Sequence, residues 1–235
     1  MPDIQLLTLD LDNTLWDVDA IIIKAEQDLR SWLTANAPES MAFYTQEHLP
    51  EFRKAVVDTH PSMVHDLSFM RIEVLNQVML AAGFEEIESR SLAEGAFEVF
   101  FEGRNRVQFF PGALESLETL SQRYTMYALT NGNADIERAG LGHLLDGAIS
   151  SADVGKSKPS KEMFHAPLEK LGLNPEQTIH IGDNPIDDIQ GAHAIGMHTI
   201  WVNLNQASLS EDAVQPHQEI AHLDELVDAI DRIHS

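Results

Sequence analysis

The chain of 235 residues contains no cysteine. Disulfide bonds, thiolate metal ligands and a cysteine nucleophile are therefore excluded. The sequence also lacks an apolar run of about 18 residues, so we expect no membrane-spanning helix and no membrane partner. Its first residues have neither the basic nor the apolar region of a signal peptide, and we therefore expect a cytoplasmic protein.

Basic residues are scarce, because 15 Lys and Arg stand against 38 Asp and Glu, for a net charge of −23. Such a chain repels nucleic acid and anionic membranes, so neither is an expected partner. A small anionic substrate would need a local positive site, which a divalent cation and a lysine can supply. The hydrophobic share of 43% is enough to bury a sizeable core.

Short apolar runs and helical patterns alternate along most of the chain. The runs predict five strands, at residues 6–9, 125–129, 148–150, 178–181 and 199–202. Segments whose apolar residues have helical spacing precede the runs at 125–129, 178–181 and 199–202. This alternation predicts an α/β fold with a Rossmann-like parallel sheet and helices on both faces. The polar stretch 204–218 is expected to be a surface loop.

One long segment interrupts this alternation. Residues 17–106 contain no strand-like run, and their apolar residues recur at helical spacing, which predicts four antiparallel helices. Connections inside an α/β domain are usually short, so this segment is expected to be an insertion. We therefore predict a Rossmann-like catalytic core at 1–16 and 107–235, and an inserted helical cap domain at 17–106.

Two carboxylates follow the first predicted strand. Asp10 and Asp12 have the same parity, so both side chains point the same way if the chain stays extended. They repel one another unless a cation lies between them or one of them keeps a proton. The alternative is a turn in which Asp12 and Asn13 cap the following helix.

Polar residues also follow the later strands. Taken singly, each has an ordinary explanation as a turn residue, a solvated lysine or a helix N-terminal acid. Parallel strands, however, place all these ends on one edge of the sheet, where α/β folds bind ligands. The residues concerned are Thr130, Asn131, Lys158, Asp183, Asp187 and Asp188. No histidine metal spacing, Gly-x-Gly-x-x-Gly pattern or Walker pattern occurs, and His180 is expected to be a core residue.

Four short motifs resemble those of the haloacid dehalogenase-like hydrolase superfamily. They are Asp10-Leu11-Asp12-Asn13-Thr14, Thr130-Asn131-Gly132, Lys158-Pro159 and Gly182-Asp183-Asn184-Pro185-Ile186-Asp187-Asp188. The resemblance implies a Rossmann-like core with a four-helix-bundle cap inserted directly after the first motif.

The resemblance also implies a role for each motif. Asp10 would be the nucleophile and Asp12 the general acid and base, while Thr130 and Lys158 would hold the phosphoryl oxygens. Mg²⁺ would be bound by Asp10, the Asp12 carbonyl and Asp183, with a further motif-four acid nearby. Asp188 fits that last position better than Asp187, although the two neighbours could exchange roles. A cluster of acids without cysteine suits Mg²⁺, which prefers oxygen ligands.

The second carboxylate favours a phosphatase, because a halide leaves without a proton and the family's dehalogenases lack Asp at the position of Asp12. Further segments resemble bacterial phosphatases that act on flavin mononucleotide and the phosphorylated riboflavin-pathway intermediate. These are Thr130-Asn131-Gly132-Asn133-Ala134, Gly140-Leu141-Gly142, Lys156-Ser157-Lys158-Pro159 and Val64-His65-Asp66. That similarity implies a ribityl phosphate substrate. Its candidate contacts are Asn131, Gly132, Trp16, His65 and Arg71, with hinge or core packing as the alternative for Trp16.

Other functions remain open on the sequence. The substrate could be a sugar phosphate, phosphoglycolate or a nucleotide, and the chain could be a dehalogenase or a phosphomutase of the same superfamily. A signalling module phosphorylated on Asp without turnover is a different class. The expected partner is a small phosphorylated metabolite, and the protein could be a monomer or a homodimer.

Overall fold

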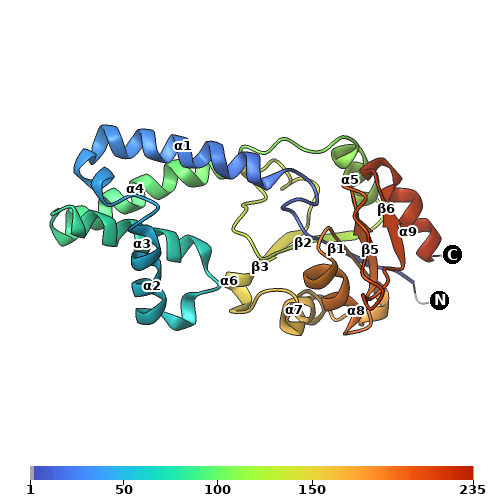
Figure 1. The fold of residues 1–235 in the computed structure, drawn as a ribbon. Coiled ribbons are helices and arrows are strands. Elements are labelled where there is room, and N and C mark those ends of the chain that lie inside the picture. The colour runs from blue at the N-terminus through green and yellow to red at the C-terminus, as the bar shows by residue number, and fades with distance from the viewer. Residues whose placement is uncertain (1–2, 235) are drawn as a thin grey trace. The chain divides into compact units, whose positions relative to one another are not determined.

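The computed structural model describes residues 3–234 and separates into two compact units (Figure 1). The first unit consists of Met1–Val18 and Val107–Ser235, and the second of Asp19–Arg106. Within the described range, the model contains no helix with the length and apolar character needed to span a bilayer. The role of residues 17–106 as a cap stays a prediction.

The first unit is built on a parallel sheet. In the described part of the chain it has six strands, in the order β3-β2-β1-β4-β5-β6. They are β1 Leu6–Leu9, β2 Thr125–Thr130, β3 Gly147–Ser150, β4 Thr178–Gly182, β5 His198–Val202 and β6 Gln218–Ile220. Every neighbouring pair is parallel, which confirms the predicted α/β fold class.

Strand β1 lies at the centre of the sheet. Leu6 pairs with Thr125 of β2 and with Thr178 of β4, and all four residues of β1 are buried. A strand buried on both faces reads as a continuous apolar run, as this one does. Directly after it, the Asp10 amide donates to the Ile181 carbonyl at 2.9 Å. Asp10 therefore leaves the sheet at the carboxyl edge, next to the end of β4.

Helices cover both sides of this sheet (Figure 1). Their bounds are α5 Ala113–Ser121, α6 Ser151–Val154, α7 Lys161–Leu171, α8 Gly191–His193 and α9 Leu226–His234. Helix α7 packs its buried Met163 and Phe164 against Leu6 and Leu129 of the sheet. Helix α5 instead packs on α9, which also contacts β5. Burying both faces in this way leaves the strand ends as the exposed, polar edges.

Two elements of the first unit differ from the prediction. Strand β6 was not predicted; it has three residues, begins at Gln218, the last residue of the predicted surface loop, and pairs only with β5. The apolar spacing between the strands predicted at 178–181 and 199–202 favours a helix, but the structure has a π-helical turn at Pro185–Gln190 followed by the short α8. The wide turn forms because the Asn184 carbonyl accepts from the amides of both Asp188, at 3.0 Å, and Ile189, at 3.2 Å.

The second unit contains four α-helices in the described chain. They are α1 Val18–Asn36, α2 Leu49–Thr59, α3 Leu67–Ala81 and α4 Glu86–Arg104, with 3₁₀ turns at Pro38–Ala42 and Pro61–Met63. Helix α3 begins at Asp66, whose side chain accepts a hydrogen bond from the Phe69 amide at 2.8 Å. Buried residues such as Leu29, Leu75 and Phe100 give this unit an apolar core of its own.

Candidate active site

A hollow of about 180 Å³ lies at the carboxyl edge of the sheet. Four loops that follow strands or precede α7 line it, and its residues are Asp10, Asp12, Asn13, Thr130, Asn131, Gly132, Lys158, Asp183, Asn184, Asp187 and Asp188. The catalytic and metal-binding residues predicted in the first unit are therefore brought together. They lie at the edge of the sheet that the strand-end argument predicted, and their catalytic and metal-binding roles stay predictions.

Lys158 lies at the centre of this group. Its side chain is 2% exposed, and Nζ donates to Asp10 Oδ1 at 2.6 Å, to Asp188 Oδ1 at 2.7 Å and to the Leu129 carbonyl at 2.7 Å. These partners use all three donors of an ammonium group. Burial opposes the charge, but Asp10 and Asp188 together raise the pKa of Lys158 above its ordinary value. The lysine is therefore a fixed cation between two carboxylates.

The carboxylates around Lys158 differ in their affinity for protons. Burial raises the pKa of Asp10 to about 7; Lys158 opposes this rise, while Asp188 and Asp183 add to it. Burial and then the charge of Asp188 raise the pKa of Asp183 to about 6. For Asp188 itself, burial is outweighed by Lys158 and His180, which hold its pKa well below the usual range. The pKa values of Asp10 and Asp183 thus stay above the usual carboxyl value despite the positive charge of Lys158.

The donor set suits a divalent cation. Oxygen atoms of Asp10, Asp183 and Asp188 all lie within 4.8 Å of one another. Carboxylate oxygens are the protein ligands that Mg²⁺ prefers. Burial is the main cause of the raised pKa values of Asp10 and Asp183, and a cation among these carboxylates would offset both that burial and their mutual repulsion. These three residues could therefore hold the ion, and of the two motif-four neighbours Asp188, not Asp187, belongs to the group.

Gly182 and His180 determine the position of the Asp188 side chain. A Cβ atom on Gly182 would lie 2.3 Å from Asp188 Cγ, so only glycine leaves room for this carboxylate. His180 Nε2 lies 3.0 Å from Asp188 Oδ1, and its Nδ1 lies 2.8 Å from Thr8 Oγ1. Burial lowers the pKa of His180, so the ring is neutral: it donates to the carboxylate and accepts from the threonine. His180 is a core residue, as expected, but it also orients a site residue, which the sequence did not reveal.

Thr14 is a further residue that was not singled out from the sequence. Its hydroxyl oxygen lies 3.1 Å from Asp10 Oδ2 and 3.2 Å from Asp183 Oδ1, and it accepts from the Asp183 amide at 3.1 Å. It therefore connects the first and last motifs. The available signal was its position four residues after Asp10, within the same short motif.

Asn131 has a contact other than the predicted one. Its Oδ1 accepts from the Lys158 amide at 2.7 Å and its Nδ2 donates to the Lys158 carbonyl at 3.0 Å. The preceding Thr130 accepts through Oγ1 from the Gly132 amide at 2.9 Å. Asn131 thus fixes the backbone of the lysine loop. Contacts of Asn131 and Gly132 with a substrate stay predictions.

Trp16 does not line the hollow, and this corrects its expected role as a substrate contact. Its side chain is fully buried, and the indole Nε1 donates to Asp12 Oδ1 at 2.8 Å. An indole enclosed in this way has no surface to offer a ligand. The alternative of core packing at the start of the insertion agrees with the structure.

The remaining candidates, His65 and Arg71, belong to the second unit. The Arg71 guanidinium lies 3.5 Å from the centre of the Phe100 ring, and Nη1 lies 3.4 Å from Glu26 Oε2. The same carboxylate accepts from the Tyr44 hydroxyl at 3.1 Å. Arg71 is therefore tied into its own unit, and His65 is partly buried. Their roles as substrate contacts stay predictions.

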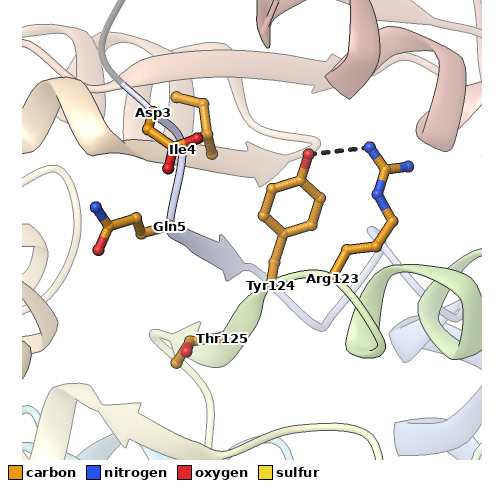
Figure 2. Close-up of a pocket in the computed structure, with 6 residues that line it drawn as sticks. All are labelled: Asp3, Ile4, Gln5, Arg123, Tyr124 and Thr125. Atoms are coloured by element: carbon orange, nitrogen blue, oxygen red, sulfur yellow. Dashed lines mark hydrogen bonds between the residues drawn. The ribbon is translucent and has the colours of Figure 1, made fainter.

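A second hollow, of about 450 Å³, lies at the amino ends of β1 and β2 (Figure 2). It is lined by Asp3, Ile4, Gln5, Arg123, Tyr124 and Thr125. In Figure 2 the Arg123 guanidinium reaches the Tyr124 hydroxyl, at 3.2 Å, and it also pairs with Asp231. This hollow is the larger of the two, yet it contains no group of carboxylates comparable to that around Lys158 among the residues that line it.

Comparison with known proteins agrees with this geometry. The family model described as "haloacid dehalogenase-like hydrolase" matches residues 4–196. The chain belongs to the haloacid dehalogenase-like hydrolase family, which confirms the resemblance drawn from the four motifs.

Similar proteins are described with several different activities. The chain is 30% identical over 230 residues to the 5-amino-6-(5-phospho-D-ribitylamino)uracil phosphatase YigB of Escherichia coli, covering 97% of this chain and 96% of that one. It is 34% identical over 139 residues to a phosphoserine phosphatase of Thermus thermophilus, covering 57% and 54% of the two chains. A solved structure described as a 2-haloacid dehalogenase from Pseudomonas syringae pv. Tomato has a TM-score of 0.93 and 38% identity, covering 97% and 99%.

Proposed function

We propose that this protein is a Mg²⁺-dependent phosphomonoester phosphatase that forms an aspartyl-phosphate on Asp10. The observation that carries the proposal is the buried contact of Lys158 with Asp10, in a hollow that Asp12 also lines. A carboxylate nucleophile and a phosphate dianion repel one another, so the attack needs positive charge at the site. Lys158 supplies one such charge, held within 2.6 Å of Asp10.

The proposed reaction has two steps. An Asp10 oxygen attacks phosphorus while the bond from phosphorus to the ester oxygen breaks, and Asp12 gives its proton to that oxygen. Water then attacks the phosphorus of the aspartyl-phosphate while Asp12 takes a proton from it, which releases phosphate and restores Asp10. Mg²⁺, when bound, supplies positive charge that stabilises the phosphoryl oxygens. Thr14 and Lys158 keep the Asp10 carboxylate oriented throughout.

A dehalogenase is the second candidate, because the Pseudomonas syringae relative is described as one. A halide departs without a proton, whereas an alkoxide does not. The presence of Asp12 in the hollow, near Asp10, therefore favours phosphate ester hydrolysis. A 2-haloacid belongs in the substrate panel for this reason.

For the substrate we propose flavin mononucleotide or a related ribityl phosphate, with the second unit acting as a cap domain. The support is the Escherichia coli relative, which matches along nearly the whole of both chains and whose name specifies a phosphoribitylamino substrate. Sugar phosphates, phosphoglycolate and nucleotides are the competing substrates.

The test is a panel of these esters and one 2-haloacid, assayed with Mg²⁺ and with a chelator. Asp10→Asn and Asp12→Asn should each lower turnover by at least about a thousandfold, and the first should form no aspartyl-phosphate. Asp231→Asn, which changes an acid at the opposite edge of the sheet, is the matched control and should keep normal turnover.

The outcomes separate the parts of the proposal. Release of halide without phosphate release would replace the phosphatase by a dehalogenase. Equal turnover of flavin mononucleotide and generic sugar phosphates would remove the ribityl assignment and leave the phosphatase standing.

A further inference from the structure

Trp16 lies beside the candidate active site and is closed off from it. The side chain is fully buried, and its ring meets Phe109 edge-on, with centroids 5.6 Å apart and planes at 75°. The main chain around it is held independently of the indole, because Asn13 donates to the Trp16 carbonyl and Leu15 to the Leu11 carbonyl, both at 2.8 Å. Backbone hydrogen bonds that do not involve the indole therefore hold the loop 11–16.

The indole N–H has a specific partner within this loop. It can only donate, and a buried donor is costly to leave without an acceptor. It donates to Asp12 Oδ1 at 2.8 Å. Since burial and the contact with Phe109 fix the ring, the direction of this N–H is fixed as well. One oxygen of Asp12 is thereby held in place, and the plane of the carboxyl group with it.

We propose that Trp16 is a positioning residue that holds Asp12 for proton transfer to the leaving group. This inference rests on the proposed phosphatase function. In a neutral carboxylic acid, the oxygen that accepts an N–H bond is the carbonyl oxygen, so the acid proton resides on the other one. Oδ1 accepts from the indole. The exchange of a proton with the leaving group is therefore assigned to Oδ2.

This arrangement matters only for leaving groups that need the proton. As the bond between phosphorus and Asp10 forms and the ester bond breaks, the electron pair of that bond stays on the departing oxygen, which takes the proton from Asp12 Oδ2. An alkoxide is too basic to leave without this proton, whereas 4-nitrophenolate leaves as a stable anion. Misorienting Asp12 should therefore slow alkyl phosphates selectively.

The test compares two esters in Trp16→Phe, which keeps an aromatic ring and removes the N–H. The value of kcat/KM reports the steps up to departure of the alcohol or phenol, so hydrolysis of the aspartyl-phosphate does not enter. For the alkyl phosphate that the wild type hydrolyses fastest, we expect kcat/KM to fall by about tenfold or more. For 4-nitrophenyl phosphate we expect a fall of less than about threefold.

Two further proteins separate positioning from packing. Phe109→Leu disturbs the same aromatic contact but keeps the indole N–H, so it should affect both esters by the same factor. In an Asp12→Asn background, Trp16→Phe should change alkyl phosphate hydrolysis by less than about twofold, because the group it positions is already gone.

A third protein keeps the test valid if phenylalanine at position 16 unfolds the loop. Replacement of Trp16 by 3-benzothienylalanine substitutes sulfur for the indole N–H and keeps the shape of the ring. It should reproduce the selective loss on the alkyl phosphate at wild-type thermal stability.

An equal loss on both esters, or none, in a folded variant would overturn the positioning role while the wild type still hydrolysed both. If the wild type hydrolysed neither ester, the proposed phosphatase function would fail, and the role of Trp16 with it. The two failures are therefore distinguishable from the wild-type measurement alone.

Discussion

The two edges of the sheet in the first unit each carry a cation that pairs with a carboxylate. At the carboxyl edge, the Lys158 side chain is 2% exposed and contacts Asp10 and Asp188. At the amino edge, the Arg123 side chain is 38% exposed and pairs with Asp231, which is 49% exposed. The same kind of ion pair is therefore buried at the carboxyl edge and exposed to solvent at the amino edge.

This difference in burial decides what each edge can do. An exposed pair is screened by water and salt and contributes about 0–1 kcal/mol. Buried charges depend on one another, and removing one partner leaves the others without compensation. Lys158, Asp10, Asp183 and Asp188, at the carboxyl edge, have displaced pKa values. They line the smaller of the two hollows, so volume is a poor guide to the candidate site.

Replacing the two cations by the same residue should give the largest difference between the edges. Lys158→Met leaves Asp10 and Asp188 facing each other, and we expect it to lower the free energy of unfolding by about 3–5 kcal/mol. Turnover should fall by at least about a thousandfold, since the positive charge near the nucleophile is lost. Arg123→Met should change stability by less than about 1 kcal/mol and leave turnover unchanged.

The measurements are urea unfolding in the presence of a chelator, so that no metal replaces the lysine, and kcat/KM with Mg²⁺. Equal destabilisation by the two substitutions would break the comparison, because burial would then not distinguish the two pairs.

A smaller effect is expected within a single turn of the carboxyl edge. Asp188 is 1% exposed and contacts Lys158, while its neighbour Asp187 is only partly buried and does not belong to the acid group. Asp188→Asn should lower kcat/KM by about 10–100-fold and weaken Mg²⁺ binding, because a ligand and the partner of Lys158 are both altered. Asp187→Asn should stay within about threefold of the wild type.

Kinetics and calorimetric Mg²⁺ titration of this matched pair decide which acid acts in the fourth motif. A larger loss from Asp187→Asn would assign the role to the partly buried neighbour and reverse the contrast between the two carboxylates.

The residues at the carboxyl edge could be predicted because the ends of strands can be recognised in the sequence of an α/β protein. Apolar runs that stop at Asp10, Thr130 and Asp183 show where strands finish, and parallel topology then places those ends together. Strand β6 could not be predicted in the same way, because its three residues are too few to show a recognisable periodicity.

The finer features depend on geometry that periodicity does not encode. Whether Asp187 or Asp188 turns inward is set by the π-helical turn after Asn184, and such a turn changes the direction of side chains without changing the spacing of apolar residues. The contacts of Thr14 with Asp183 and of His180 with Thr8 likewise require the register between β1 and β4. Trp16 was misassigned because an aromatic residue beside a catalytic motif reads equally well as a ligand contact and as core.

The last expected effect uses protons to tell the two edges apart. The pKa values of Asp10, about 7, and Asp183, about 6, lie above the ordinary carboxyl value. Below these values the folded protein keeps protons that Mg²⁺ must displace, and above them both groups are ionised. Mg²⁺ affinity should therefore rise as the pH is raised from 5, by up to about tenfold per unit for each proton displaced, and level off above about pH 8. Calorimetry in buffers of different ionisation enthalpy measures the released protons directly. Asp183→Asn should flatten this dependence and Asp231→Asn should keep it, whereas an affinity independent of pH would mean that Mg²⁺ does not bind among the carboxylates around Lys158.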